Sequence, residues 1–186
     1  KKIFNSEEIE NTINELAIIY SLSLGDHCKV KRSNNIYSYE NLCEIYDECA
    51  LANEKLKARA YDISTTLASV GKMATKCGDT VNKIFKDKTF IVSDPQVRCD
   101  DVYGNRFVKL HQDILGMRTD SCVSCWAPLI NTNELQGGLR IVPRSHLMGP
   151  VEHEWNTNKW GVKAHEICDY DLYASKVEPA LSIDAG

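Results

Sequence analysis

The sequence predicts an α+β protein in which a helical N-terminal region packs on a β-rich domain built as a sandwich or barrel. Two observations predict this architecture. Apolar residues recur every three or four positions over residues 9–20 and again over residues 42–74, which is the period of amphipathic helices. After Gly78 the pattern changes to short runs of β-forming residues separated by Asp-Pro, Tyr-Gly-Asn and Gly-Gly turns. We therefore assign residues 1–85 to a helical region and residues 86–186 to a β-domain.

The first predicted helix spans residues 5–24. Asn5 or Ser6 can cap its N-terminus, and two glutamates in its first turn are favoured by the helix dipole. Gly25 marks its end. The basic and polar segment that follows, residues 27–38, is expected to be an exposed loop.

A second helical pattern runs from Tyr39 to Ala74 without a proline. It indicates either one long helix or two helices joined near Tyr61 or Gly71. The apolar stripe fits a coiled-coil dimer as well as packing against a neighbouring element of the same chain. Packing within the chain is favoured, because coiled coils usually sustain strict heptads for longer.

Short runs rich in β-branched and aromatic residues predict the strands of the β-domain. They comprise residues 88–93, 106–110, 121–126 and 138–142. The chain shows no internal repeat and no low-complexity tract.

Composition excludes several classes of protein. With 43% hydrophobic and 26% charged residues, the 186-residue chain has the composition of a globular protein. Its net charge of −4 has the wrong sign for binding nucleic acid through phosphates. We find neither a signal peptide nor a stretch of about 20 apolar residues, so we expect no membrane partner. Eight cysteines are too few for a disulfide scaffold and indicate reduced thiols in the cytoplasm.

The most specific chemical feature is His111-Gln112-Asp113, which follows the predicted strand over residues 106–110. Side chains at i and i+2 of a strand share a face, so His111 and Asp113 can converge on one ion while Gln112 faces the other way. Two histidines and one carboxylate on one face of an octahedron leave three positions open, which suits non-haem Fe(II) with a co-substrate and O₂. Taken alone, a His-x-Asp is weak evidence for a metal site, because it occurs often by chance and is then an ordinary polar pair.

Three segments in this order and spacing resemble the phytanoyl-CoA dioxygenase family. They are His111–Asp113, Ser124–Leu129 and Gln136–His146, with Gly149-Pro150 behind them. The resemblance covers about residues 88–186, and the N-terminal helices carry no such signature. It implies a double-stranded β-helix core, that is, a cupin-like jelly roll. It also implies an oxygenase that depends on Fe(II) and 2-oxoglutarate.

The resemblance assigns roles to four residues. His111 and Asp113 would be Fe(II) ligands and thus catalytic. Trp126 falls where the family places a tryptophan beside the co-substrate, and Gln96 looks like a strand glutamine that approaches 2-oxoglutarate. The family usually has glycine where this chain has Arg144, so we expect a type I rather than a type II turn there.

The family's third iron ligand is a histidine on a later strand, followed by a basic residue that pairs with 2-oxoglutarate. Leu181–Gly186 resembles the approach to that strand, so we expect the β-domain to be cut before its last strands and both residues to lie beyond Gly186. The resemblance implies a structural role for His146. We expect His153 and His165, in a polar insertion, at the surface or in a substrate pocket.

The reaction that the resemblance implies is hydroxylation of a C–H bond in a small-molecule metabolite, with succinate and CO₂ as co-products. Asp113 favours hydroxylation over halogenation, because a related halogenase leaves its position open for chloride. Residues 152–173 are expected to form a variable lid over the substrate. Two alternatives stay open: a catalytically silent member that binds a metal or ligand, and an assembly module that acts through its long N-terminal helix.

Overall fold

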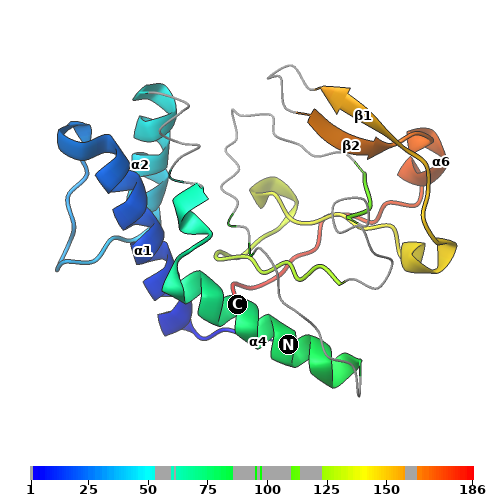
Figure 1. Cartoon of the computed structure of the whole chain (residues 1–186), viewed down its shortest axis with the longest axis horizontal. Coiled ribbons are helices and arrows are strands. Elements are labelled where there is room, and N and C mark those ends of the chain that lie inside the picture. The colour runs from blue at the N-terminus through cyan, green and yellow to red at the C-terminus, as the bar shows by residue number, and fades with distance from the viewer. Residues whose placement is uncertain are drawn as a thin grey trace. The chain divides into compact units, whose positions relative to one another are not determined.

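The computed structural model divides the chain into two compact units (Figure 1). The N-terminal unit comprises Lys1–Cys99, Ala127–Ile130 and Ala185–Gly186. The C-terminal unit comprises Asp100–Trp126 and Asn131–Asp184. Within them the structure describes residues 2–52, 60, 62–85, 95, 97, 110–113, 123–157 and 163–186.

Helix α1 spans Ser6–Leu24, which confirms the predicted helix to within a residue (Figure 1). It begins with a capping box. The side chain of Asn5 accepts a hydrogen bond from the backbone N–H of Glu8, and the Glu8 carboxylate accepts one from the backbone N–H of Asn5, each at 2.9 Å. Gly25 ends the helix at φ 58, a backbone conformation that favours glycine.

Helix α2 spans Tyr39–Ala52 and packs on α1. Tyr20 of α1 and Tyr46 of α2 meet edge to face, with ring centroids 5.5 Å apart. Apolar residues of the two helices share one buried cluster with three residues outside them, Phe4, Tyr37 and Ala60. The helical members are Ile9, Ile13, Leu16, Ala17, Tyr20, Leu24, Leu42, Ile45, Tyr46 and Cys49. The apolar stripe of α2 therefore packs within its own chain, as expected.

Helix α4 spans Ala68–Ile84. The chain leaves the helical conformation just before it, at Leu67, where φ is −63 and ψ is 141. The Thr66 hydroxyl donates a hydrogen bond of 2.7 Å to the backbone carbonyl of Ile63, which satisfies an acceptor at a helix end. Of the two predicted joints, Gly71 is wrong because it lies inside α4, and Tyr61 lies outside the described residues.

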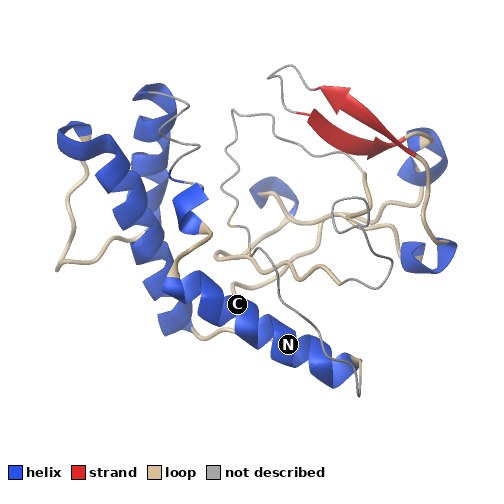
Figure 2. Ribbon diagram, viewed as in Figure 1, coloured by secondary structure: helices blue, strands red, loops and turns tan. Residues whose placement is uncertain are grey.

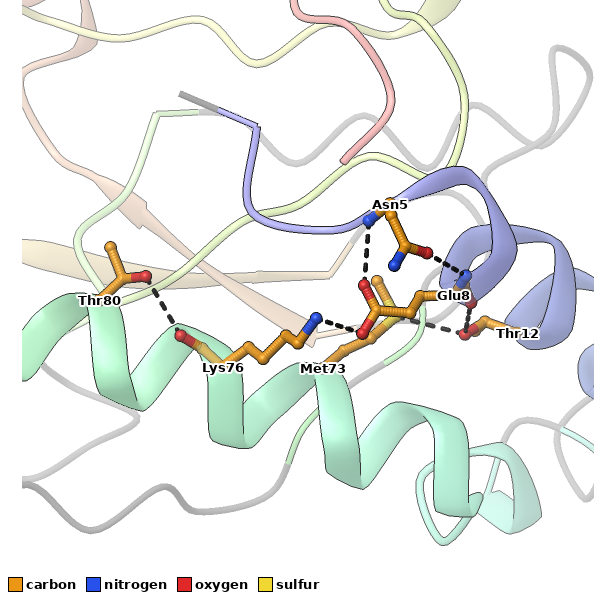
Figure 3. A network of polar contacts seen from close by, with 6 residues as sticks. All are labelled: Asn5, Glu8, Thr12, Met73, Lys76 and Thr80. Carbon is orange, nitrogen blue, oxygen red and sulfur yellow. Dashed lines mark hydrogen bonds and ion pairs between the residues drawn. The ribbon is translucent and has the colours of Figure 1, made fainter.

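A network of polar contacts fastens α1 to α4 (Figure 3). Lys76 of α4 forms an ion pair with the carboxylate of Glu8. The Thr12 hydroxyl donates to the backbone carbonyl of Glu8 at 2.8 Å and lies 3.3 Å from Sδ of Met73. The hydrogen bond from Lys76 and the one from the Asn5 backbone lower the pKa of Glu8. One carboxylate thus caps α1 and joins it to α4.

The strands of the described part belong to the C-terminal unit (Figure 2). Strand β1 spans His153–Thr157 and pairs antiparallel with β2, Lys163–Ile167. The short helix α6, Tyr170–Ala174, follows. Single 3₁₀ turns occur at Gly25–His27, Glu134–Gln136 and Ser145–Met148. Helices together with this small sheet give the mixed architecture that the α+β class requires.

The strand predicted over residues 138–142 is wrong. Two backbone hydrogen bonds of 2.9 Å do join this segment to a later one: Leu181 donates to the carbonyl of Leu139, and Glu178 to that of Ile141. The acceptors are two residues apart and the donors three, so the register shifts between the bonds. Such a shift interrupts a regular ladder at this point, as a bulge does.

The other predicted strands fall mostly on residues that the structure does not describe. Residues 123–126 are described and form no strand, and Leu110 lies in a bend. The run over residues 88–93 and the rest of 106–110 lie outside the described residues. None of the helices that the structure describes combines the length and the apolar character needed to cross a membrane.

The turn at Pro143-Arg144 differs from the prediction. Ser145 donates its backbone N–H to the carbonyl of Val142 at 3.2 Å, which closes the turn. Arg144 has φ 63 and ψ 11, values close to those of the third residue of a type II turn. The expectation of a type I turn is therefore wrong, because the arginine adopts the left-handed conformation that glycine adopts at lower cost.

Candidate metal centre

His111 and Asp113 lie side by side in the C-terminal unit. Nε2 of His111 is 3.2 Å from Oδ1 of Asp113. The structure shows no strand at Leu110–Asp113, so a bend and a turn, rather than a regular strand, bring the two side chains together. About a third of the His111 side chain and half of the Asp113 side chain are exposed, at 34% and 51%. Both groups are therefore accessible to an ion from solvent.

Their separation fits two neighbouring ligands of one metal ion. Ligand atoms about 2.1 Å from an ion and at right angles to each other are about 3.0 Å apart. Imidazole nitrogen and carboxylate oxygen are also the donors of the two-histidine, one-carboxylate iron sites. The same separation suits a hydrogen bond between imidazole and carboxylate, so the geometry accommodates a polar pair as well.

Ser124 holds the second oxygen of the Asp113 carboxylate. Its hydroxyl donates a hydrogen bond of 2.5 Å to Oδ2, while Oδ1 faces His111. This contact fixes the rotation of the carboxylate. Trp126 lies two residues further along the same segment, with 43% of its surface exposed. The structure thus connects two of the segments on which the resemblance rests.

His153 contacts Gln112, the residue between His111 and Asp113, and both of its ring nitrogens are engaged. Nε2 accepts the backbone N–H of Gln112 at 2.9 Å, and Nδ1 lies 2.8 Å from the carbonyl oxygen of Val151. Only the neutral ring with its proton on Nδ1 satisfies both contacts. His153 would have to give up the bond to Gln112 to coordinate a metal through Nε2.

Two further histidines belong to the C-terminal unit, His165 and His146. His165 makes ring contacts with Trp155 and with His153, the latter with centroids 6.5 Å apart. His146 is exposed on the 3₁₀ turn Ser145–Met148. Within the residues that the structure describes, no three His, Cys, Asp or Glu side chains are grouped so that they could hold an ion. Gln96 lies outside the described residues.

Two residues that contact His111–Asp113, namely Ser124 and His153, were not among the site residues expected from the sequence. No local signal marks Ser124, because residues 123–126 form no strand and 11 residues separate Ser124 from Asp113. The same holds for His153, because 41 residues separate it from Gln112. Sequence reasoning placed it at the surface or in a substrate pocket.

Comparison with known families gives one match. Residues 31–180 match the family model described as phytanoyl-CoA dioxygenase (PhyH). The match contains the segments His111–Asp113, Ser124–Leu129 and Gln136–His146. It also extends over α2 and α4, where the sequence alone showed no signature. Neither the curated proteins nor the solved structures gave a match.

Proposed function

Because the chain belongs to the phytanoyl-CoA dioxygenase family, a family of Fe(II)- and 2-oxoglutarate-dependent oxygenases, we propose that it hydroxylates a C–H bond of a small-molecule metabolite. Membership supports the general class of reaction. The contact between His111 and Asp113 is the observation that carries the proposal to this chain. It brings the two donor types of the family's metal site to a separation that one ion can bridge.

In this proposal each residue near the pair has a distinct task. His111 and Asp113 hold Fe(II), and Ser124 fixes the orientation of the Asp113 carboxylate. When bound, Fe(II) with 2-oxoglutarate and O₂ supplies oxidative decarboxylation to succinate and CO₂, coupled to hydroxylation of the substrate. Asp113 occupies the position that a halogenase leaves to chloride, which supports hydroxylation. We assign Trp126 and Gln96 to the 2-oxoglutarate side of the site, as the resemblance implies.

The proposal includes a double-stranded β-helix around the site, which is the cupin-like fold that the family implies. The antiparallel pair β1–β2 is compatible with such a core. We also propose the cytoplasm as the compartment. The cysteines that support it are reduced thiols, namely Cys28, Cys43, Cys49, Cys125 and Cys168.

The test is succinate formation from 2-oxoglutarate by the full-length protein supplied with Fe(II) and O₂. We expect His111→Ala and Asp113→Ala each to abolish it, because either change removes one of the two ligands. Asp26→Ala and His27→Ala are matched controls, since they change the same residue types at exposed positions of the N-terminal unit. The controls should retain wild-type succinate formation.

Two outcomes would contradict the proposal. Unchanged succinate formation in the His111 and Asp113 variants would refute the assignment of the site. A wild-type protein that binds Fe(II) but forms no succinate would instead be the catalytically silent member of the fold.

A further inference from the structure

Gln112, the residue between His111 and Asp113, is held by three hydrogen bonds. Its backbone N–H donates to Nε2 of His153 at 2.9 Å. Its side-chain amide donates to the carbonyl of Gly149 at 3.0 Å and accepts the backbone N–H of Val151 at 2.9 Å. We call these four residues, Gln112, Gly149, Val151 and His153, the Gln112 clamp. The clamp fixes both the backbone and the side chain of Gln112.

His153 is itself fixed in the orientation that the clamp needs. Its Nδ1–H donates to the carbonyl of Val151 at 2.8 Å, so the lone pair on Nε2 is available for the N–H of Gln112. The backbone of Val151 therefore bonds both Gln112 and His153: its N–H donates to the Gln112 side chain, and its carbonyl accepts from the His153 ring. The short segment from Gly149 to His153 holds the ring and the amide together.

A second contact fastens the chain on the other side of His111. The backbone N–H of Ile167, at the end of β2, donates to the carbonyl of Leu110 at 3.0 Å. Ile167 pairs with His153 in the β1–β2 register. Leu110 and Gln112 are thus both bonded to the base of this hairpin, so His111 lies between two anchored residues.

This anchoring matters because no regular ladder holds the segment. Leu110–Asp113 consists of a bend and a turn, and both ligand side chains are partly exposed. An unanchored segment of this kind samples many backbone conformations, and a metal must restrict them when it binds. Fixing the backbone at residues 110 and 112 beforehand removes part of that cost.

We propose that Gln112 and His153 are positioning residues that pre-orient His111 and Asp113 for the metal, and that His153 is not itself a ligand. The inference rests on the proposed function, since it assumes that this pair binds the metal. Partners that orient metal ligands typically change metal affinity about 10- to 100-fold when they are removed. We expect the lower end of this range, because His153 acts through the backbone.

The test compares His153→Leu with His153→Gln. Leucine removes the acceptor for the Gln112 N–H, whereas glutamine can place an oxygen near the position of Nε2. Two readouts are needed: the hydrogen-exchange rate of the Gln112 amide in the metal-free protein, and the affinity for Co(II) as a spectroscopic probe. The control is His165→Leu, which changes the paired strand of the same hairpin and its ring contacts.

We expect His153→Leu to speed exchange of the Gln112 amide and to weaken Co(II) binding about 10-fold. His153→Gln should restore both to near wild type, and His165→Leu should leave both unchanged. If wild type binds Co(II) through His111 but His153→Leu does not weaken that binding, the positioning role is refuted while the proposed function stands. A wild type that binds no Co(II) and forms no succinate would refute the proposed function, and the positioning role with it.

Discussion

The hydroxyl of Ser124 helps to orient the carboxylate of Asp113. Ser124 donates to Oδ2, and this leaves Oδ1 facing His111. We predict that Ser124→Ala lowers the affinity for Co(II) about 10-fold, because the carboxylate then loses the hydrogen bond that holds Oδ2. Ser124→Thr keeps the hydroxyl and should retain most of the affinity. Equal affinities of wild type and the alanine variant, measured by absorbance titration, would show that the hydrogen bond does not orient the ligand.

Arg144 adopts a left-handed backbone conformation in the type II turn, which is unfavourable for a residue with a Cβ. Glycine adopts φ near 63 without the steric cost of a Cβ, although it loses more entropy on folding. We predict that Arg144→Gly raises the free energy of unfolding by about 0.5 kcal/mol, measured by denaturant titration. Arg144→Ala keeps the Cβ and should give no gain. A gain of the same size in both variants would assign the effect to loss of the arginine side chain.

The side chains at the site differ in how far sequence could predict them. The convergence of His111 and Asp113 was expected from their i, i+2 spacing, and the structure places them in contact, although on a turn rather than a strand. Ser124 and Asp113 are 11 residues apart, and His153 and Gln112 are 41 apart. Contacts of this kind depend on how separate segments pack, which no local pattern encodes.

Among the elements, α1 and α4 are joined in part by the ion pair between Glu8 and Lys76. The contacts with Lys76 and Asn5 lower its pKa below the usual 4.5. A lowered pKa in the folded state adds stability above pH 4.5, and this stability is lost as the pH falls through the folded-state pKa.

The prediction is that wild type loses more stability than Lys76→Met when the pH falls from about 5 to about 3. The variant lacks the ion pair with Glu8, so protonation of that carboxylate should cost it less. Thermal unfolding of both proteins at each pH measures the difference. Parallel loss of stability in the two proteins would show that the ion pair contributes nothing in solution.

The helices were more predictable than the strands for a physical reason. The ends of α1 are set by local groups, the Asn5–Glu8 capping box and Gly25, which are visible in the sequence. The break before α4 is set by the extended backbone at Leu67 and has no proline or glycine to mark it. The strand expected over residues 138–142 depended on its register with a segment about 40 residues later, where the hydrogen bonds shift.

Over the molecule as a whole, the family match covers helices α2 and α4 as well as the half of the chain that carries the motifs. Sequence reasoning found the family only in the His-x-Asp, Ser-Cys-Trp and Pro-x-Ser-His segments. Amphipathic helices repeat the same apolar period in unrelated proteins, so α2 and α4 carry no pattern that distinguishes one family from another. Four apolar residues of α2, namely Leu42, Ile45, Tyr46 and Cys49, lie in the core of the N-terminal unit, whereas Leu51 is exposed.

The central claim is that His111 and Asp113 hold the iron that this chain uses to consume 2-oxoglutarate. Succinate formation by the full-length protein tests it most directly, with His111→Ala and Asp113→Ala compared against Asp26→Ala and His27→Ala. The account predicts Fe(II)-dependent succinate in wild type and both controls, and none in either variant of the pair. Succinate formation that survives in the His111 or Asp113 variant would contradict it.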